Sequence, residues 1–237
     1  MADTYISADL GQLTDFSAIS VTNVESYQKP YLVASDNREA RFDPRDVVPV
    51  FEVPLIERMQ VRYRKVLERL VEIQHHPSLL MRECETIIDA TGLGQAVFEM
   101  AEEMGLEVTG IVITGGHEAH FKDGKYYVPR KELIGAVIVG VQERRIRVAN
   151  LGEISDITKD ELRNLRLKQK PLSASEAIEP DQASQHDDIV LSLGMGIWRA
   201  MQEHQTEMVY LDRLEDDNSA QIGGGSDYDI ANWGLKV

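Results

Sequence analysis

The sequence is poor in cysteine and in long hydrophobic runs, and each shortage excludes a class of protein. Cys84 is the single cysteine among 237 residues, so an intramolecular disulfide is impossible and a reducing compartment is expected. No apolar run approaches the roughly 18–20 residues that span a bilayer. No signal peptide is recognised either, because Asp3 stands at the start and no apolar segment follows. We therefore expect a soluble cytoplasmic protein that has no membrane partner.

Positive charge is also scarce. The chain has 25 Lys and Arg against 40 Asp and Glu, a net charge of −15, which argues against non-specific nucleic-acid binding by the whole chain. The charge is uneven, since residues 122–170 contain 12 basic against 7 acidic residues and residues 203–237 contain 2 against 8. A basic region beside an acidic tail is compatible with a local polyanion site, and equally with a solvated charged surface.

The length and the hydrophobic fraction of 43% suit one large domain with a buried core. We expect this domain to span residues 1–210. Residues 211–237 are acidic and contain the run Gly223-Gly224-Gly225, so they are expected to form a flexible C-terminal tail.

The N-terminal part favours an antiparallel meander of strands rich in β-branched residues. The first turn is short, so the two strands that it joins are expected to pair antiparallel. Pro49 and Pro54 make the last strand an edge strand or an interrupted one. A helix with an apolar stripe is expected from about Glu57 to His75. The expected strands are residues 5–10, 17–24, 31–34 and 47–53.

The second half alternates strands and helices. Residues 86–90, 95–104 and 108–114 are expected to form a strand, a helix and a strand, which implies a parallel pair and a right-handed crossover. Thr158 is interpreted as the cap of a helix, with Glu161 at the capping-box position. The remaining elements are a loop at 117–124, a helix at 130–143, a basic extended segment at 144–149 and a last helix at 186–204.

Acidic residues stand at the ends of three apolar elements. Asp9 and Asp89 each close a strand, and Asp187 and Asp188 begin the last helix. A buried ionised carboxylate is costly unless a cation, a metal or a hydrogen-bonded turn meets it. Taken singly, each acid also suits a turn or a helix N-terminus. Helix geometry favours Asp187 over Asp188 as the core-facing acid, but helix starts shift by a residue or two.

Together these acids predict a metal site. Carboxylate oxygens suit hard divalent cations such as Mg²⁺ and Mn²⁺. Two such ions about 3.5–4 Å apart activate a water and stabilise the leaving oxygen in phosphodiester cleavage. The element order, a meander followed by strand, helix, strand and a late acidic helix, matches a ribonuclease H-like fold. This fold is an α/β class in which helices flank a mixed sheet of antiparallel and parallel strands.

Five segments of the chain form a set: 9–12 with Asp15 and 17–18, then 89–94, 127–133, 145–149 and 186–188. In this order they resemble the nuclease domain of the large terminase subunit of tailed phages. The resemblance covers about residues 4–200 and implies an endonuclease that needs Mg²⁺ or Mn²⁺ and cuts concatemeric viral DNA for packaging. It also implies double-stranded DNA, a terminase ATPase domain, a small terminase subunit and the portal as partners.

The resemblance implies a role for each matching side chain. Asp9 and Asp89 would be metal ligands, and Asp187 or Asp188 would be the third acid. Asp15 would be an auxiliary acid or a turn cap. His186 would orient a ligand or simply precede the helix. The candidate contacts to the DNA backbone, which would otherwise be solvated surface residues, are Lys122, Lys125, Arg130, Lys131, Arg144, Arg145 and Arg147.

Other functions stay open at this point. A Holliday-junction resolvase or another ribonuclease H-like nuclease would share the metal chemistry and differ in substrate. A sugar-kinase or actin fold would use Thr91-Gly92-Leu93-Gly94 to clamp phosphates, but the chain lacks the length for two such domains. A non-catalytic packaging module would tolerate loss of the acids. The sequence contains no G-x-x-x-x-G-K-[ST] loop, so ATP-driven translocation is not expected of this chain.

Overall fold

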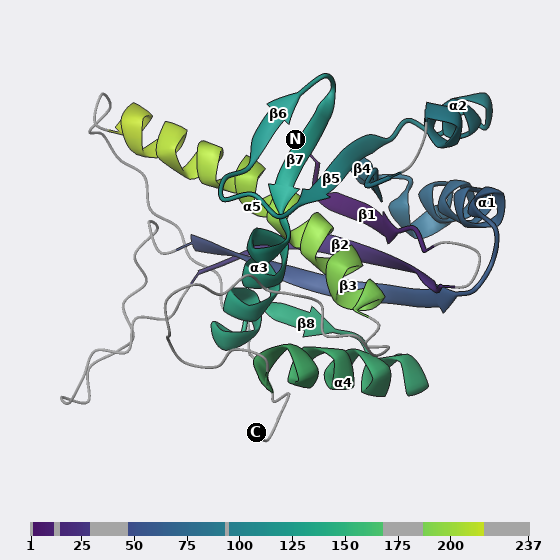
Figure 1. The fold of residues 1–237 in the computed structure, drawn as a ribbon. Coiled ribbons are helices and arrows are strands. Elements are labelled where there is room, and N and C mark those ends of the chain that lie inside the picture. Colours follow the sequence, from purple (N-terminus) through teal and green to yellow (C-terminus); the bar gives the residue numbers. More distant parts are fainter. Residues whose placement is uncertain (1, 12–14, 29–46, 93–94, 168–186, 216–237) are drawn as a thin grey trace. The chain divides into compact units, whose positions relative to one another are not determined.

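The centre of the fold is an eight-stranded mixed β-sheet with helices on both of its faces (Figure 1). In this computed structural model the strands lie in the order β6-β7-β5-β4-β1-β2-β3-β8. They are β1 (Thr4–Asp9), β2 (Ser17–Gln28), β3 (Val47–Met59), β4 (Cys84–Asp89), β5 (Thr109–Thr114), β6 (His120–Lys122), β7 (Lys125–Pro129) and β8 (Ile146–Val148). The structure describes residues 2–11, 15–28, 47–92, 95–167 and 187–215.

The helices assigned in these residues are α1 (Tyr63–Gln74), the short 3₁₀ helix η2 (Pro77–Leu79), α2 (Gln95–Glu103), α3 (Arg130–Gln142), α4 (Glu153–Leu167) and α5 (Asp188–Glu215). Residues 1–204 form one compact unit, and residues 205–237 form a second, whose described part continues α5. None of the described helices is both long enough and apolar enough to cross a lipid bilayer.

The predicted antiparallel meander is confirmed by β1, β2 and β3, because β2 pairs antiparallel with both neighbours. The expected strand at 31–34 lies outside the described residues. β3 is longer than predicted. Arg58 and Met59 still pair with β2, so the helix expected from Glu57 begins only at Tyr63. The apolar period predicted for that helix is present in α1. Pairing with β2 nevertheless keeps residues 57–59 in the sheet, and a local sequence pattern does not show such a long-range pairing.

The position of β3 in the sheet also differs from the prediction. Pro49 and Pro54 predicted an edge strand or an interrupted one. β8 pairs with β3 in parallel and lies outside it, so β3 is not the edge, while a register shift between Val21 and Asn23 interrupts its pairing with β2 beside Pro54. The pairing covers only Phe51 to Val53, between the two prolines. A proline removes only its own N–H group from a ladder, so a short strand still pairs between two of them.

The parallel half of the sheet follows the prediction for β4, α2 and β5. β4 pairs in parallel with both β1 and β5. Residues 117–124 were expected to be a loop, but His120 to Lys122 form β6, which pairs antiparallel with β7. The turn between them is Asp123-Gly124, with φ of 50° and 75°. Asp-Gly in this conformation is a strong hairpin signal, and the sequence interpretation overlooked it.

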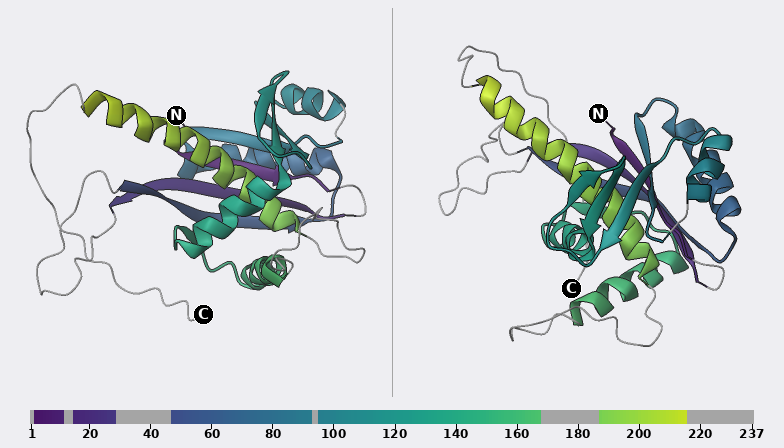
Figure 2. Two further views of the ribbon diagram at one scale, coloured as in Figure 1. Left: turned by 60° about the vertical axis from the view of Figure 1, so that its left-hand side comes forward. Right: turned by 45° about the horizontal axis from the view of Figure 1, so that its top comes forward.

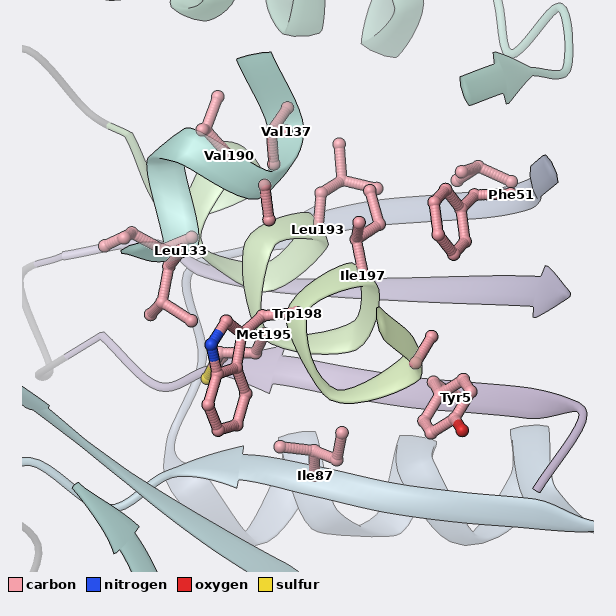
Figure 3. Close-up of a cluster of buried hydrophobic side chains, with 14 of the residues drawn as sticks. Tyr5, Phe51, Ile87, Leu133, Val137, Val190, Leu193, Met195, Ile197 and Trp198 are labelled. Carbon is pink, nitrogen blue, oxygen red and sulfur yellow. The ribbon is translucent and has the colours of Figure 1, made fainter. Parts of the chain in front are cut away.

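The two faces of the sheet carry separate hydrophobic clusters. Ile6 and Ala8 of β1 pack towards α1 and α2, whereas Tyr5 of the same strand lies in the cluster of α3 and α5. Successive side chains of a strand point to opposite faces, so Asp9 shares the face of Tyr5. Figure 3 shows the second cluster, in which Leu193 and Ile197 of α5 lie over the sheet. Figure 2 shows α5 crossing this face in two further views.

The start of α4 differs from the prediction. Thr158 was expected to cap a helix, but α4 begins at Glu153 and Thr158 lies inside it. The Thr158 hydroxyl donates to the carbonyl oxygen of Ile154, four residues earlier, at 2.7 Å. A mid-helix threonine satisfies its hydroxyl in this way, so a Thr-x-x-Glu pattern does not by itself mark a helix start.

Two glycines of α5 allow it to pack closely. A side-chain carbon at Gly194 would lie 2.9 Å from the carbonyl oxygen of Leu133 in α3, and one at Gly196 would lie 2.9 Å from the Ser7 hydroxyl of β1. Ser192 continues this contact, because its hydroxyl donates to the carbonyl oxygen of Ser7 at 2.9 Å. The first turns of α5 are therefore held tightly against the sheet, at the end where Asp9 lies.

Candidate active site

Two of the predicted acids, Asp9 and Asp89, lie side by side at the carboxyl ends of neighbouring strands. β1 and β4 run in parallel with Ala8 beside Ile88, so the next residue of each strand is the aspartate. Tyr5 and Ile87, which share the parity of these aspartates, belong to the cluster under α5. Both carboxyl groups therefore lie on the face that α5 and α3 cover.

The electrostatics of this pair follow from burial and from the proximity of the two acids. Burial raises the pKa of Asp9 well above its ordinary value, and the charges of Asp89 and Asp188 raise it further. Arg130 partly opposes this shift. The carboxyl groups of Asp9 and Asp89 interact directly, and this contact raises the pKa of Asp9 while it lowers that of Asp89.

Asp89 is the more solvated member of the pair and is anchored by the turn that follows it. The backbone N–H of Thr91 donates to the Asp89 carboxylate at 2.7 Å. Burial raises the pKa of Asp89, while hydrogen bonds from Thr91 and Asp9 oppose the shift. The ends of β1 and β4 therefore present two adjacent carboxyl groups whose pKa values are raised by burial, a shift that the charge of Arg130 only partly opposes.

The N-terminus of α5 brings two more acids to this end of the sheet. Asp187 forms an ion pair with Arg130, the first residue of α3. Asp188 accepts from Arg58, whose Nη2 lies 3.1 Å from Asp188 Oδ2. The charge of Asp188 also acts on the pKa of Asp9. Four predicted acids and two arginines thus gather from β1, β3, β4, α3 and α5.

Arg58 is a site residue that sequence reasoning missed. It pairs with Ala18 of β2, which in turn pairs with Asp9, so the three residues lie in one row across the sheet. Its guanidinium lies 4.0 Å from the ring centroid of Phe16. The residue was hidden because residues 57–62 were assigned to a helix. In a strand interpretation, its distance from Asp9 would have followed from the pairing of the meander.

Glu161 is the second residue that sequence reasoning placed wrongly. It lies in α4 and accepts a hydrogen bond from the backbone N–H of Val190, so it caps α5 rather than its own helix. Burial raises its pKa to about 7, and a backbone hydrogen bond from Val190 opposes the shift. Its other carboxylate oxygen is buried without a hydrogen-bond partner among the described residues. Glu161 therefore helps to fix the helix end that carries Asp188.

Comparison with known proteins bears on the fold. No protein-family model matches the chain, and no curated protein matches it. Among solved structures it is similar to the large terminase nuclease from thermophilic phage G20c, with a TM-score of 0.51 and 20% sequence identity over 82% of this chain and 81% of that one. The chain has a terminase-nuclease fold. The predicted ribonuclease H-like mixed sheet flanked by helices is confirmed.

A second similar structure is the manganese-soaked terminase nuclease domain of human cytomegalovirus. Its TM-score is 0.47, and its sequence is 8% identical over 84% of this chain and 83% of that one. The likeness to the phage G20c nuclease, at 20% identity, concerns the fold alone. What the site does in this chain has to be argued from its own residues.

Of the two predicted auxiliary residues, Asp15 belongs to the part of the chain that the structure describes and His186 does not. Asp15 is exposed in the turn between β1 and β2. That turn is tied by the backbone N–H of Gly11, which donates to the Ser17 hydroxyl at 3.1 Å. His186 lies outside the described residues. The roles of Asp15 and His186 therefore stay predictions.

The seven basic residues predicted to contact DNA do not form one surface. Arg130 and Lys131 begin α3 beside the acids, while Lys122 and Lys125 lie on the β6–β7 hairpin. The other three lie at or next to β8, which is the opposite edge of the sheet, roughly 30 Å from β6. They are Arg144, Arg145 and Arg147.

The basic residues near β8 already have structural roles. Arg144 follows α3 with φ of 58° and its N–H donates to the carbonyl oxygen of Val141, which closes the helix. Arg145 donates to the carbonyl oxygen of Pro49 at 2.9 Å, and only 15% of its side chain is exposed. Arg147 lies 3.4 Å from Glu52. These contacts hold β8 and the end of α3 against β3.

The donor set at the four acids fits a hard divalent cation in its chemistry, because every candidate ligand is a carboxylate oxygen. Among the described residues, however, no three His, Cys, Asp or Glu side chains are arranged so that they would enclose an ion. Asp9 and Asp89 meet, but Asp188 is turned to Arg58 and Asp187 to Arg130. A cation at the Asp9–Asp89 pair would offset the charge of both carboxylates, and a third ligand would have to leave an arginine.

Proposed function

We propose that this protein is a divalent-metal-dependent endonuclease of the large-terminase type, which cuts concatemeric viral DNA for genome packaging. The observation that carries the proposal is the Asp9–Asp89 pair. A buried and a half-buried carboxyl group lie side by side at the carboxyl ends of adjacent parallel strands, near the acidic start of α5, and burial raises the pKa of both. Such a pair is costly to the fold, which favours a role in binding a cation.

Asp9, Asp89 and Asp188 are the proposed ligands of Mg²⁺ or Mn²⁺, with two ions expected. Both acids form an ion pair with an arginine, and Asp188 is preferred to Asp187 because its charge acts on Asp9. When bound, the ions supply an activated water and stabilise the leaving oxygen of the phosphodiester. Groups of the chain itself hold the carboxylates in place: the backbone N–H of Thr91 donates to Asp89, and the Glu161 carboxylate accepts from the Val190 N–H at the start of α5.

The proposed substrate is double-stranded DNA. Arg130 and Lys131 begin α3 beside the acids and are the best-placed predicted contacts to the phosphate backbone. The net charge of −15 makes weak affinity for DNA expected of this chain alone. We therefore expect a terminase ATPase domain, a small terminase subunit and the portal to deliver DNA to it, in the host-cell cytoplasm.

Metal-dependent nicking of a supercoiled plasmid tests the proposal. The protein is incubated with Mn²⁺ or Mg²⁺, beside Asp89→Ala and an EDTA control. Nicking and linearisation that both the variant and EDTA abolish would support the nuclease and its site together. If wild type and Asp89→Ala are equally inactive with either metal, the catalytic proposal fails. A four-way junction offered beside the plasmid separates a terminase-type nuclease from a junction resolvase, which would prefer the junction.

A further inference from the structure

The third proposed ligand, Asp188, is already held by a cation that belongs to the chain. Two nitrogen atoms of Arg58 approach the same carboxylate oxygen of Asp188, Nε at 3.3 Å and Nη2 at 3.1 Å. The side chains of Arg58 and Asp188 are only 13% and 15% exposed. An ion pair so removed from water is much less screened than a surface pair, and breaking it by removing one partner has a large effect.

Arg58 is held from two sides, so this contact is more than a chance surface pair. Its backbone lies in β3, paired with Ala18 beside Asp9, and its guanidinium lies over the ring of Phe16 at 4.0 Å. A planar guanidinium that is stacked on an aromatic ring loses little further freedom when it binds a carboxylate. The ion pair to Asp188 is thus pre-organised by the sheet.

The second arginine of the site differs in this respect. Arg130 pairs with Asp187, but its side chain is 39% exposed, and its charge also acts on Asp9 and Asp89. Its charge serves several acids at once. Arg58 has Asp188 as its carboxylate partner within hydrogen-bonding distance, at the side of the row away from β4.

We propose that Arg58 is a positioning residue that competes with the divalent cation for Asp188. In the metal-free protein its guanidinium neutralises Asp188 and turns that carboxylate away from the Asp9–Asp89 pair. Metal binding then requires Asp188 to exchange the guanidinium for the ion. The inference rests on the proposed metal site. It adds a free-energy cost to the assembly of that site, because Asp188 leaves Arg58 only when the ion is supplied.

Calorimetric titration of the full chain with Mn²⁺ alone tests this competition, because it measures metal binding without any cleavage. Arg58→Met keeps the length of the side chain and removes its charge, and we expect it to bind Mn²⁺ about tenfold more tightly than wild type. The matched control is Arg69→Met, which breaks the ion pair of Arg69 with Glu57 at 2.6 Å and should leave the Kd unchanged. The melting temperature of metal-free Arg58→Met is expected to fall and its rise on adding Mn²⁺ to exceed that of wild type.

A double-mutant cycle separates competition from a general effect on the fold. The tighter binding of Arg58→Met should disappear when Asp188→Asn is added, because the contested carboxylate is then gone. If Arg58→Met binds Mn²⁺ as wild type does, or more weakly, the competition is overturned. Should Arg58→Met fail to fold, Phe16→Leu loosens the same guanidinium. The Kd of Phe16→Leu for Mn²⁺ must then be about twofold to threefold lower than that of wild type for the proposal to stand.

The same titration distinguishes failure of this inference from failure of the proposed function. If wild type binds no Mn²⁺, or if Asp89→Asn binds it equally well, the metal site itself is wrong. If wild type binds Mn²⁺ and Asp89→Asn does not, but Arg58→Met is no tighter, the metal site stands and only the role of Arg58 is wrong.

Discussion

The same three elements build a polar cluster at each end of this face of the sheet, and the two clusters differ in how their charges are met. β1, β4 and α5 each supply residues to both. In β1 and β4 the two contributions are four residues apart, so they share a face. We call the two groups the balanced cluster, made of Tyr5, Glu85, Arg199 and Glu203, and the acid cluster, made of Asp9, Asp89, Asp187 and Asp188 with Arg58 and Arg130.

In the balanced cluster a guanidinium stands between the acids. Arg199 lies 3.0 Å from Glu85 and 2.5 Å from Glu203. The Tyr5 hydroxyl donates to Glu203 at 2.6 Å, and burial raises the pKa of Tyr5 above its usual range. Each carboxylate is thus in direct contact with a cation from the same chain, which makes this cluster a structural one.

In the acid cluster the two central carboxyl groups interact with each other rather than with a guanidinium between them. Asp9 and Asp89 hydrogen-bond to each other, while the two arginines contact Asp187 and Asp188 instead. Burial alone therefore does not mark a functional site, since both clusters are largely buried. The informative difference is that, among the described residues, the arginine ion pairs of the acid cluster join Asp187 and Asp188, whereas the central pair of Asp9 and Asp89 interacts with itself.

The largest expected effect separates the two clusters by catalysis. Asp89→Asn should lower the initial rate of plasmid nicking at least a thousandfold, about 4 kcal/mol of barrier, because a proposed ligand is lost. Glu85→Gln, four residues earlier on the same strand face, should keep the rate within about threefold. Equal loss of rate in the two variants, at equal concentrations of folded protein, would contradict the division.

The next effect separates the clusters by stability. Arg199→Met removes the cation of the balanced cluster and leaves two partly buried carboxylates uncompensated, so the free energy of unfolding should fall by about 3 kcal/mol. Urea unfolding measures this change. The nicking rate per folded molecule should stay near that of wild type, and a rate that falls with intact folding would make Arg199 part of the nuclease site.

In the acid cluster, removal of a carboxyl group from the central pair should stabilise the protein. The pKa of Asp9 is raised in the folded state, so its stabilising contribution is fully present below the unfolded pKa of about 4 and is lost as the pH rises through the folded pKa. Asp9→Asn should therefore be more stable than wild type by about 1–2 kcal/mol at pH 7 in EDTA, with little difference at pH 4. The exposed Asp15→Asn, as a control, should stay within about 0.5 kcal/mol. Urea unfolding across this pH range decides the sign.

A smaller effect concerns the cap of α5. Burial raises the pKa of Glu161 to about 7, so its ionisation opposes folding as the pH rises from about 4.3 through 7. Glu161→Gln keeps an oxygen for the Val190 N–H and should gain about 1 kcal/mol at pH 8, since water still screens part of the charge. The gain should vanish at pH 4.5. Glu161→Ala, which loses the cap, should be less stable than Glu161→Gln at every pH tested by thermal unfolding.

The sequence by itself determined the elements whose signals are local. Alternation and β-branched residues located β1 and β2, and the pattern around residues 86–114 predicted the parallel unit of β4, α2 and β5. Because an acid that closes an apolar strand is visible in the chain, Asp9 and Asp89 were identified as partners before their strands were paired. The element order then sufficed for the fold, since parallel neighbours carry their strand ends to the same edge.

Only the tertiary structure decided how the charges are shared. Arg58 and Asp188 are 130 residues apart and meet because β3 and the start of α5 come to the same end of the sheet. Glu161 caps a helix other than its own, and the seven basic residues are divided between opposite edges of the sheet. The physical reason is the same in each case. A side chain's charge is set by neighbours that are brought to it by strand order and helix packing, and those long-range contacts leave no periodic trace in the sequence.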